Sequence, residues 1–265
     1  MQIPIERLPE GSKQFDITTV IYRINSVAVA IVDALFSMES TENARISQRT
    51  QYFDSLLANL NLNPNVVPSE QIRLYEELKA NDKTNRRRIL NWGLVMAWTS
   101  FEALMEDLLK IFFWEQPRGF LNWGGKLNVT YEEIQAMGQI DEVAESFYSK
   151  ALRQFTDKPI KERLKDLQSK LGIREEDLFG LRFSNETIRA RLKGWGPGSM
   201  EALSDARNDI VHRGALPLQS LGEFEDAVLV FERLLLNLGT ILAEKMGIPI
   251  TINGVPYQPD QSGQR

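Results

Sequence analysis

The sequence contains no cysteine and a single histidine in 265 residues. Without cysteine there is no disulfide framework, no thiolate nucleophile, and no zinc-thiolate or iron–sulfur site. One histidine per chain also excludes a zinc or iron site that needs two histidines from the same chain. Any metal would have to be a hard ion with oxygen ligands, and no such site is predicted. If an imidazole acts as acid or base, it must be His212.

Charge and hydropathy exclude further classes of protein. The chain has 31 basic and 36 acidic residues, for a formal net charge of −5, which argues against a protein that coats nucleic acid non-specifically. A local basic patch remains compatible with that charge. Residues 1–12 lack the apolar segment of a secretory signal, and the apolar stretch Phe15–Met38 is interrupted by Asp16, Arg23 and Asp33. We therefore expect a cytoplasmic protein that does not engage a membrane.

Helical signals dominate the sequence. Apolar residues recur every three or four positions, and capping patterns such as Ser220 with Glu223 mark helix boundaries. The expected helices cover residues 17–38, 46–60, 70–79, 84–114, 159–171, 199–213 and 221–246, and a capping box at Thr130 and Glu133 begins another. Only residues 248–255, around the hairpin-type pair Asn253-Gly254, have a weak strand pattern. The sequence thus predicts an all-α, up-and-down helical bundle with additional N-terminal helices.

Three regions are expected along the chain. Residues 1–82 form an N-terminal helical extension packed on the core, residues 83–248 form the helical core, and residues 249–265 form a short irregular tail. The candidate boundaries are polar stretches at about residues 61–68 and 81–84.

The strongest chemical motif is Arg207-Asn-Asp-Ile-Val-His212 near the end of an expected helix. The buried side of this helix is predicted to comprise Leu203, Ala206 and Ile210. Asn208 and His212 lie one turn apart on another face, so the amide is placed to orient the imidazole. Arg207 lies at the edge of the apolar arc, where its guanidinium needs solvent, an acceptor or an anion. A partner subunit that turns this edge into a pocket would explain its position.

These features resemble the HEPN proteins, which are all-α domains with a signature of Arg, four to six residues, and His, usually with Asn, Asp or His directly after the Arg. Arg207, Asn208 and His212 match this signature. It also lies late in the chain, before the last expected core helix, as it does in the family. The helix around Phe101–Leu109 is similar to the family's first core helix, so the resemblance covers about Thr84 to Met246.

The resemblance implies a metal-independent, cofactor-free endoribonuclease that cleaves single-stranded RNA. In active members, two subunits form a homodimer with one composite active site. The RNA 2′-OH attacks the adjacent phosphate and leaves a 2′,3′-cyclic phosphate and a 5′-OH. His212 would move the protons, Arg207 would hold the phosphate oxygens, and Asn208 would orient the imidazole or the phosphate.

The resemblance also implies a biological setting in defence, stress or toxin-like RNA targeting, with an antitoxin or regulatory protein as a further partner. Some HEPN toxins carry a tyrosine two residues after the histidine, where a partner nucleotidyltransferase attaches adenylates. Gly214 occupies that position here. Neutralisation through that tyrosine is therefore not expected.

Two basic clusters are candidates for contacts with RNA phosphates. The first comprises Lys83, Arg86, Arg87 and Arg88, and the second comprises Arg182, Arg189, Arg191 and Lys193. Trp195 follows the second cluster and could stack on a base. The alternative for both clusters is an ordinary solvated helix face.

Simpler interpretations of the motif remain. His212 would then only satisfy the last carbonyls of its helix and the helix dipole, and Arg207 would form a structural ion pair with Asp205 or Asp209. A Ser-His-Asp triad that uses His212 has no supporting motif. At the level of function, the alternatives to a ribonuclease are a non-catalytic HEPN module that binds a nucleotide or a partner protein, and a helical scaffold without a site.

Overall fold

The computed structural model describes residues 14–59, 69–123, 130, 132, 140–182, 184–253 and 255–256. Its helices are α1 (Ile17–Asn59), α2 (Ser69–Glu115), α3 (Pro117–Trp123), α5 (Ile140–Thr156), α6 (Ile160–Leu171), α7 (Glu175–Leu178), α8 (Glu186–Arg191), α9 (Pro197–Arg213) and α10 (Leu221–Met246). The strands are β1 (Phe15–Asp16), β2 (Ile250–Ile252) and β3 (Val255–Pro256). The predicted all-α class is confirmed. The capping box at Thr130 and Glu133 and the boundary at residues 61–68 fall largely or wholly outside the described residues.

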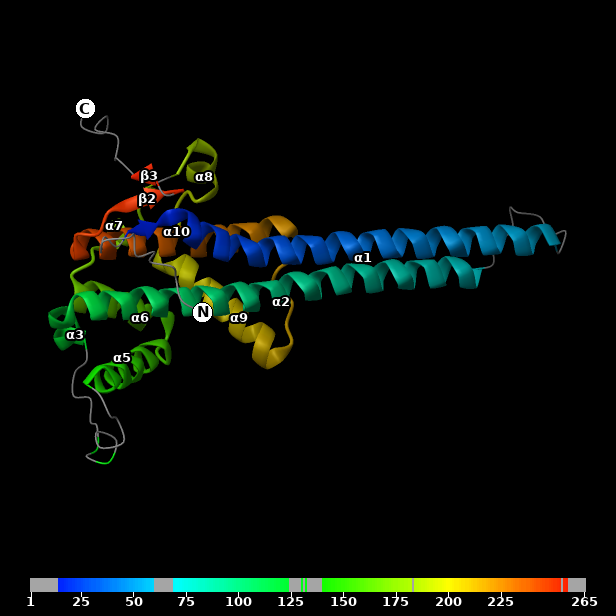
Figure 1. The fold of residues 1–265 in the computed structure, drawn as a ribbon. Helices are drawn as coiled ribbons and strands as arrows, with labels where there is room; N and C mark the ends of the chain where they lie inside the picture. Colours follow the sequence, from blue (N-terminus) through cyan, green and yellow to red (C-terminus); the bar gives the residue numbers. More distant parts are fainter. Residues whose placement is uncertain are drawn as a thin grey trace.

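The two longest helices are more continuous than predicted. α1 has 43 residues and α2 has 47, and they run side by side as an antiparallel pair that extends beyond the other helices (Figure 1). We expected each to consist of two helices, with polar breaks near residues 39–45 and 81–84. These polar residues are compatible with a helix, and neither segment contains proline. The expected boundary at residue 82 therefore lies inside α2.

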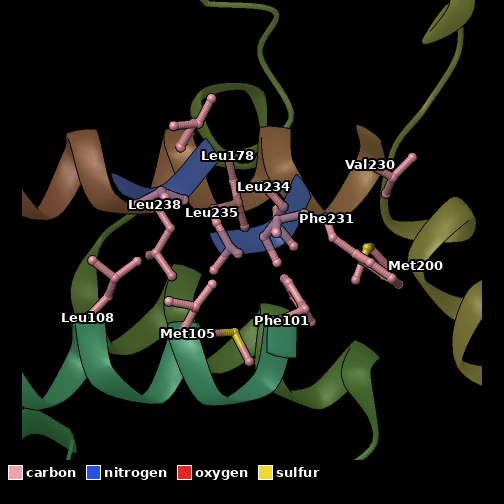
Figure 2. Close-up of a cluster of buried hydrophobic side chains, with 14 of the residues drawn as sticks. Phe101, Met105, Leu108, Leu178, Met200, Val230, Phe231, Leu234, Leu235 and Leu238 are labelled. Atoms are coloured by element: carbon pink, nitrogen blue, oxygen red, sulfur yellow. The ribbon is translucent and has the colours of Figure 1, made fainter. Parts of the chain in front are cut away.

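The core is built from α1, α2 and α10. Phe101 of α2 stacks on Phe231 of α10 at 5.1 Å between ring centroids, and Trp98 meets Phe231 edge-on at 5.5 Å. Figure 2 shows Phe101, Phe231 and neighbouring leucines in this layer. α1 also belongs to the core, because Ile31 packs so closely on Gly93 that a Cβ there would lie 2.9 Å from the Ile31 Cγ1. The first half of α1 is thus part of the same hydrophobic core as α10.

Polar contacts fix how α10 sits among its neighbours. Glu232 and Arg233 form a buried ion pair at 2.5 Å, and Asn25 of α1 donates a hydrogen bond of 2.9 Å to Glu232. Further along α10, the Asn237 amide donates to the backbone carbonyls of Leu178 and Gly180. Because a buried polar group is costly when unpaired, these bonds favour one register of α10.

A small sheet joins the two ends of the described chain. β1 pairs in parallel with β2, and β2 pairs antiparallel with β3 through a turn in which Asn253 has a φ of 52°. The turn confirms the hairpin expected at Asn253-Gly254. The expectation of an irregular tail is wrong for Ile250–Ile252 and Val255–Pro256, which are strands. The parallel pairing with β1 was not predicted, since it joins segments more than 230 residues apart.

The first part of α1 has two unlike faces. Val20, Ile24 and Ile31 are buried, whereas Tyr22 and Phe36 are 74% and 64% exposed. By length and composition alone, Ile17–Thr41 is apolar enough to cross a membrane, and it is the one such helix among the described residues. Core helices share this length and composition, and the buried Val20, Ile24 and Ile31 place this part of α1 in the core.

Candidate functional site

α9 carries the predicted site and has clear local reasons to begin and end where it does. Pro197 occupies the first turn, and the Ser199 hydroxyl accepts a hydrogen bond of 3.3 Å from the Gly196 N–H. Gly214 ends the helix with a φ of 62°, a left-handed conformation that glycine adopts without strain. His212 is therefore held in the last turn of α9.

α9 packs on the protein as its apolar pattern predicts. Met200 and Ile210 are buried, and Leu203 and Ala206 pack half-buried against the core. Its neighbours in space are α2 and α6 (Figure 1). The predicted buried side is confirmed, with Met200 as an additional member.

Arg207 is half-buried and has one polar contact. Its Nη1 donates a hydrogen bond of 2.9 Å to the side-chain oxygen of Asn208. Its Nε is buried and has no hydrogen-bond partner among the described residues. The expected alternative, an ion pair with Asp205 or Asp209, is not formed, and Asp209 instead pairs with Arg213 at 2.9 Å. The guanidinium is thus positioned without a neutralising carboxylate from the described residues.

His212 is exposed and forms no hydrogen bond with the described part of the chain. The Asn208 oxygen that was expected to orient it accepts from Arg207 instead. Nor does the imidazole satisfy last-turn carbonyls, since Gly214 and Ala215 donate to Ile210 and Asp209 at 3.1 Å. Neither of these hydrogen bonds of His212 is formed among the described residues, but its place in the last turn of α9 still allows the predicted interaction with the helix dipole.

A groove of about 590 Å³ lies beside α9, and we call it the α6–α9 groove. Trp98 and Glu102 of α2, the turn before α6, and the polar face of α9 line it. Arg207 and Asn208 line the groove, whereas His212 lies outside it. On an α-helix, five residues correspond to about 140° of rotation and about 7.5 Å of rise, so Arg207 and His212 leave α9 in different directions.

The charges of the α6–α9 groove are nearly balanced. Its cationic residues are Lys158, Lys161, Arg163 and Arg207, and its acidic residues are Glu102, Asp157, Glu201 and Asp205. Arg163 is 7% exposed and pairs with Glu102 at 2.5 Å, and Lys161 pairs with Glu201 at 3.4 Å. Lys158 pairs with Asp166 of α6 at 2.5 Å. Among these four cations, Arg207 is the one without a carboxylate partner in the described residues.

Two neighbouring carboxyl groups of α2, those of Glu106 and Asp107, have perturbed pKa values. Burial raises the pKa of Glu106 above its ordinary value, and the neighbouring charge of Asp107 raises it further. Burial likewise raises the pKa of Asp107, against the opposing effect of Arg23, 3.8 Å away. This part of α2 therefore resists additional negative charge.

The structure places the first basic cluster near the His212 end of α9. Asn91 of α2 exchanges two hydrogen bonds with Leu218, at 2.9 and 3.0 Å, and so holds the segment after α9 against α2. Arg87 donates a bond of 2.6 Å to the carbonyl of Leu216 in that segment. Arg86 pairs with Glu39 at 3.4 Å, and Arg88 contacts Asn85 at 3.3 Å.

The second basic cluster lies at the opposite end of α9. Arg191 pairs with Asp226 at 2.6 Å, and Arg189 donates to the Ser184 carbonyl at 3.0 Å. Lys193 is exposed, but it precedes α9 and is separated from His212 by a helix about 25 Å long. Trp195 packs edge-on against Phe179 at 5.1 Å, so its ring is partly covered. Arg189, Arg191 and Lys193 do not line the cavity that Arg86 and Arg87 line.

Sequence reasoning missed the lysines and the arginine that α6 brings to the groove. Lys158, Lys161 and Arg163 are about 45 residues from Arg207 in sequence and carry no motif. The one available signal was the helix start at Pro159, confirmed as the N-cap of α6.

The chain matches no protein-family model, no curated protein and no solved structure.

Proposed function

We propose that this protein is a metal-independent endoribonuclease of HEPN type that cleaves single-stranded RNA as a homodimer. The observation that carries the proposal is Arg207, a half-buried guanidinium on the wall of a groove with no carboxylate partner among the described residues. Arginine offers planar, permanently charged donors that suit the oxygens of a phosphate in its transition state. Defence, stress or toxin-like roles and a cytoplasmic location are part of the same proposal.

The second chain of the proposed homodimer supplies the second imidazole that a single chain lacks. His212 and Arg207 point away from α9 in different directions, and the sequence has no other histidine. A two-fold axis close to the His212 end of α9 would bring the imidazole of each subunit toward the guanidinium of the other. It would also provide two imidazoles, so that one acts as base while the other acts as acid.

In the proposed cleavage reaction, two imidazoles and Arg207 move the protons and stabilise the charge without a metal. One His212 accepts the proton of the ribose 2′-OH as that oxygen attacks the adjacent phosphorus. The bond from phosphorus to the 5′-oxygen breaks, and the other subunit's imidazolium protonates the leaving oxygen. The products are a 2′,3′-cyclic phosphate and a 5′-OH, and Arg207 stabilises the charge on the non-bridging oxygens.

The test compares purified full-length variants on labelled single-stranded RNA with EDTA present. The wild type is expected to cleave and to leave cyclic-phosphate ends, whereas His212→Ala and Arg207→Ala lose activity. Arg213→Ala is the matched control, because Arg213 is an exposed neighbour whose one ion pair with the described residues is to Asp209. Equal cleavage by wild type and His212→Ala, or no cleavage by the wild type, would refute the proposal.

One observation favours a second candidate function, a non-catalytic helical module that binds a nucleotide or a partner protein. The α6–α9 groove carries as many carboxylates as cations, which gives a polyanion less attraction than a basic groove would. For this candidate, Arg207→Ala and His212→Ala would change binding or stability, and no RNA cleavage would be found.

A further inference from the structure

α10 begins beside α1 and α2 (Figure 1). Residues of these three segments line a second cavity. It encloses about 250 Å³, and we call it the α1–α2 pocket. Lys83, Arg86 and Arg87 of α2 line it together with apolar side chains that include Leu35 and Phe36 of α1. A cavity of this size accommodates part of one small ligand and leaves the rest in solvent.

The charge of the α1–α2 pocket is positive. Among the described residues, three cationic side chains and one carboxylate, Glu39, line the pocket, in a chain whose net charge is −5. Glu39 pairs with Arg86 at 3.4 Å, and both side chains are more than a third exposed, so water screens that pair. Lys83 is exposed and has no ion pair with the described residues. The pocket therefore favours an anionic ligand.

Arg87 is the fixed member of the three cations. Its Nη2 donates a hydrogen bond of 2.6 Å to the Leu216 carbonyl, which ties it to the segment before α10. Its Nε is buried and lacks a partner among the described residues. A guanidinium held in this way keeps its charge in one place, so an anion gains its attraction at little cost in side-chain entropy.

Phe36 gives the same pocket an aromatic surface. Its side chain lines the cavity and is 64% exposed, which is unusual for phenylalanine. A flat apolar group stacked on this ring would remove it from water, and nucleobases stack on exposed aromatic rings in this way. The ligand that combines such a group with a phosphate is a nucleotide.

We propose that the α1–α2 pocket binds a nucleotide, with its phosphate at Lys83 and Arg87 and its base against Phe36. This site goes beyond the ribonuclease proposal, because it contains neither Arg207 nor His212. The nucleotide is either a free mononucleotide or one unit of an RNA strand. Both sources present the same phosphate and base to the pocket.

The experiment measures binding of AMP by calorimetry and of a labelled single-stranded RNA by fluorescence anisotropy. The full-length protein is used in a His212→Ala background, so that cleavage does not interfere. The pocket variants are Lys83→Glu and Phe36→Ala, both at exposed positions. Their controls are Lys165→Glu on α6 and Tyr22→Ala on α1, which are exposed and lie outside the pocket. Circular dichroism checks that all four variants keep the wild-type fold.

We expect Lys83→Glu to weaken binding about tenfold, the effect of losing roughly one favourable charge contact and adding an unfavourable one. Phe36→Ala is expected to weaken binding several-fold, and the controls should have no effect. If the pocket variants weaken AMP binding, a free mononucleotide is sufficient as the ligand. If they weaken RNA binding alone, the ligand is one unit of an RNA strand. The proposal is overturned if neither probe binds at millimolar concentration, or if both bind the pocket variants as tightly as the controls.

Discussion

The α6–α9 groove and the α1–α2 pocket are both rich in basic side chains, yet their charges are organised differently. In the groove, Lys161 and Arg163 are paired with carboxylates that line the same surface. In the pocket, the described lining residues include three cations and one carboxylate, Glu39, which pairs with Arg86. A count of lysine and arginine therefore says little about anion binding until the carboxylates that neutralise them are known.

Two arginines of the α6–α9 groove have different roles. Arg163 is deeply buried and donates to Glu102 and to the carbonyls of Lys158 and Thr156. Arg207, on the same groove, has Asn208 as its one partner among the described residues. Arg163 therefore stabilises the turn before α6, whereas the guanidinium of Arg207 is available to a ligand.

The largest effect is expected from Arg207. Arg207→Ala should lower RNA cleavage by about 10²–10³-fold, which is the typical effect of removing one donor that stabilises transition-state charge. Arg207→Lys should also lose most activity, because an ammonium cannot form the planar two-bond contact. Single-turnover rates on labelled RNA measure this effect.

The stability of Arg207→Ala is the control for its expected loss of activity. Because its Nε is already without a partner among the described residues, Arg207→Ala should change the free energy of unfolding by less than about 1 kcal/mol. A loss of activity that merely followed a large loss of stability would contradict the role assigned to this residue.

The next effect concerns the paired arginine. Arg163→Met should lower the free energy of unfolding by about 2–3 kcal/mol, since it leaves Glu102 and two carbonyls without their donor. This value is below that of a fully buried pair because Glu102 is 25% exposed. Urea denaturation measures the change. Lys161→Met, at a side chain 76% exposed, is the control, and an equal effect of both would mean that the Arg163 contacts add nothing.

Local signals in the sequence predicted much of α9 and its surroundings. Gly214, Pro159 and the Ser220–Glu223 pair each act within one turn of a helix, and all three appear as helix boundaries in the structure. Interruptions of the apolar stripe were a poorer guide. Residues 81–84 are polar, Lys83 among them is exposed, and the helix continues through them.

Contacts between distant segments could not be predicted in the same way. Arg163 reaches Glu102 across 61 positions, and Arg87 reaches Leu216 across 129 positions. The motif correctly singled out Arg207 as a residue at the edge of an apolar face. It could not show that Asn208 would bond to Arg207 rather than to His212, because both contacts are compatible with helical spacing.

A smaller effect is expected from pH. The pKa of Glu106 is raised by burial and by Asp107, so its contribution to stability is present below the ordinary value of 4.5 and is lost as pH rises through the raised value. Glu106→Gln should therefore be more stable than the wild type at pH 7, and the difference should vanish at pH 4. Thermal melts across this range measure it. A variant that is less stable at pH 7 would show that the carboxylate is favourably paired.

The smallest effect is expected at Asp177, where the sign is opposite. A hydrogen bond from Arg174 lowers the pKa of Asp177, so its contribution is present above the ordinary value of 3.8 and is lost as pH falls through the lowered value. Asp177→Asn should be slightly less stable than the wild type at pH 7 and equal to it in strong acid. Because Arg174 is exposed at 68% of its side chain, a change comparable to that of Arg163→Met would contradict this assignment.

The most direct test of the composite active site mixes wild-type chains with His212→Ala chains at constant total concentration, after subunit exchange. In an equal mixture of freely exchanging dimers, about a quarter of the dimers carry two His212 residues. If both imidazoles are needed, RNA cleavage should fall to about this fraction, following the square of the wild-type fraction. Activity that falls only in proportion to the wild-type fraction would show that one imidazole suffices at each site and would contradict an active site that needs both.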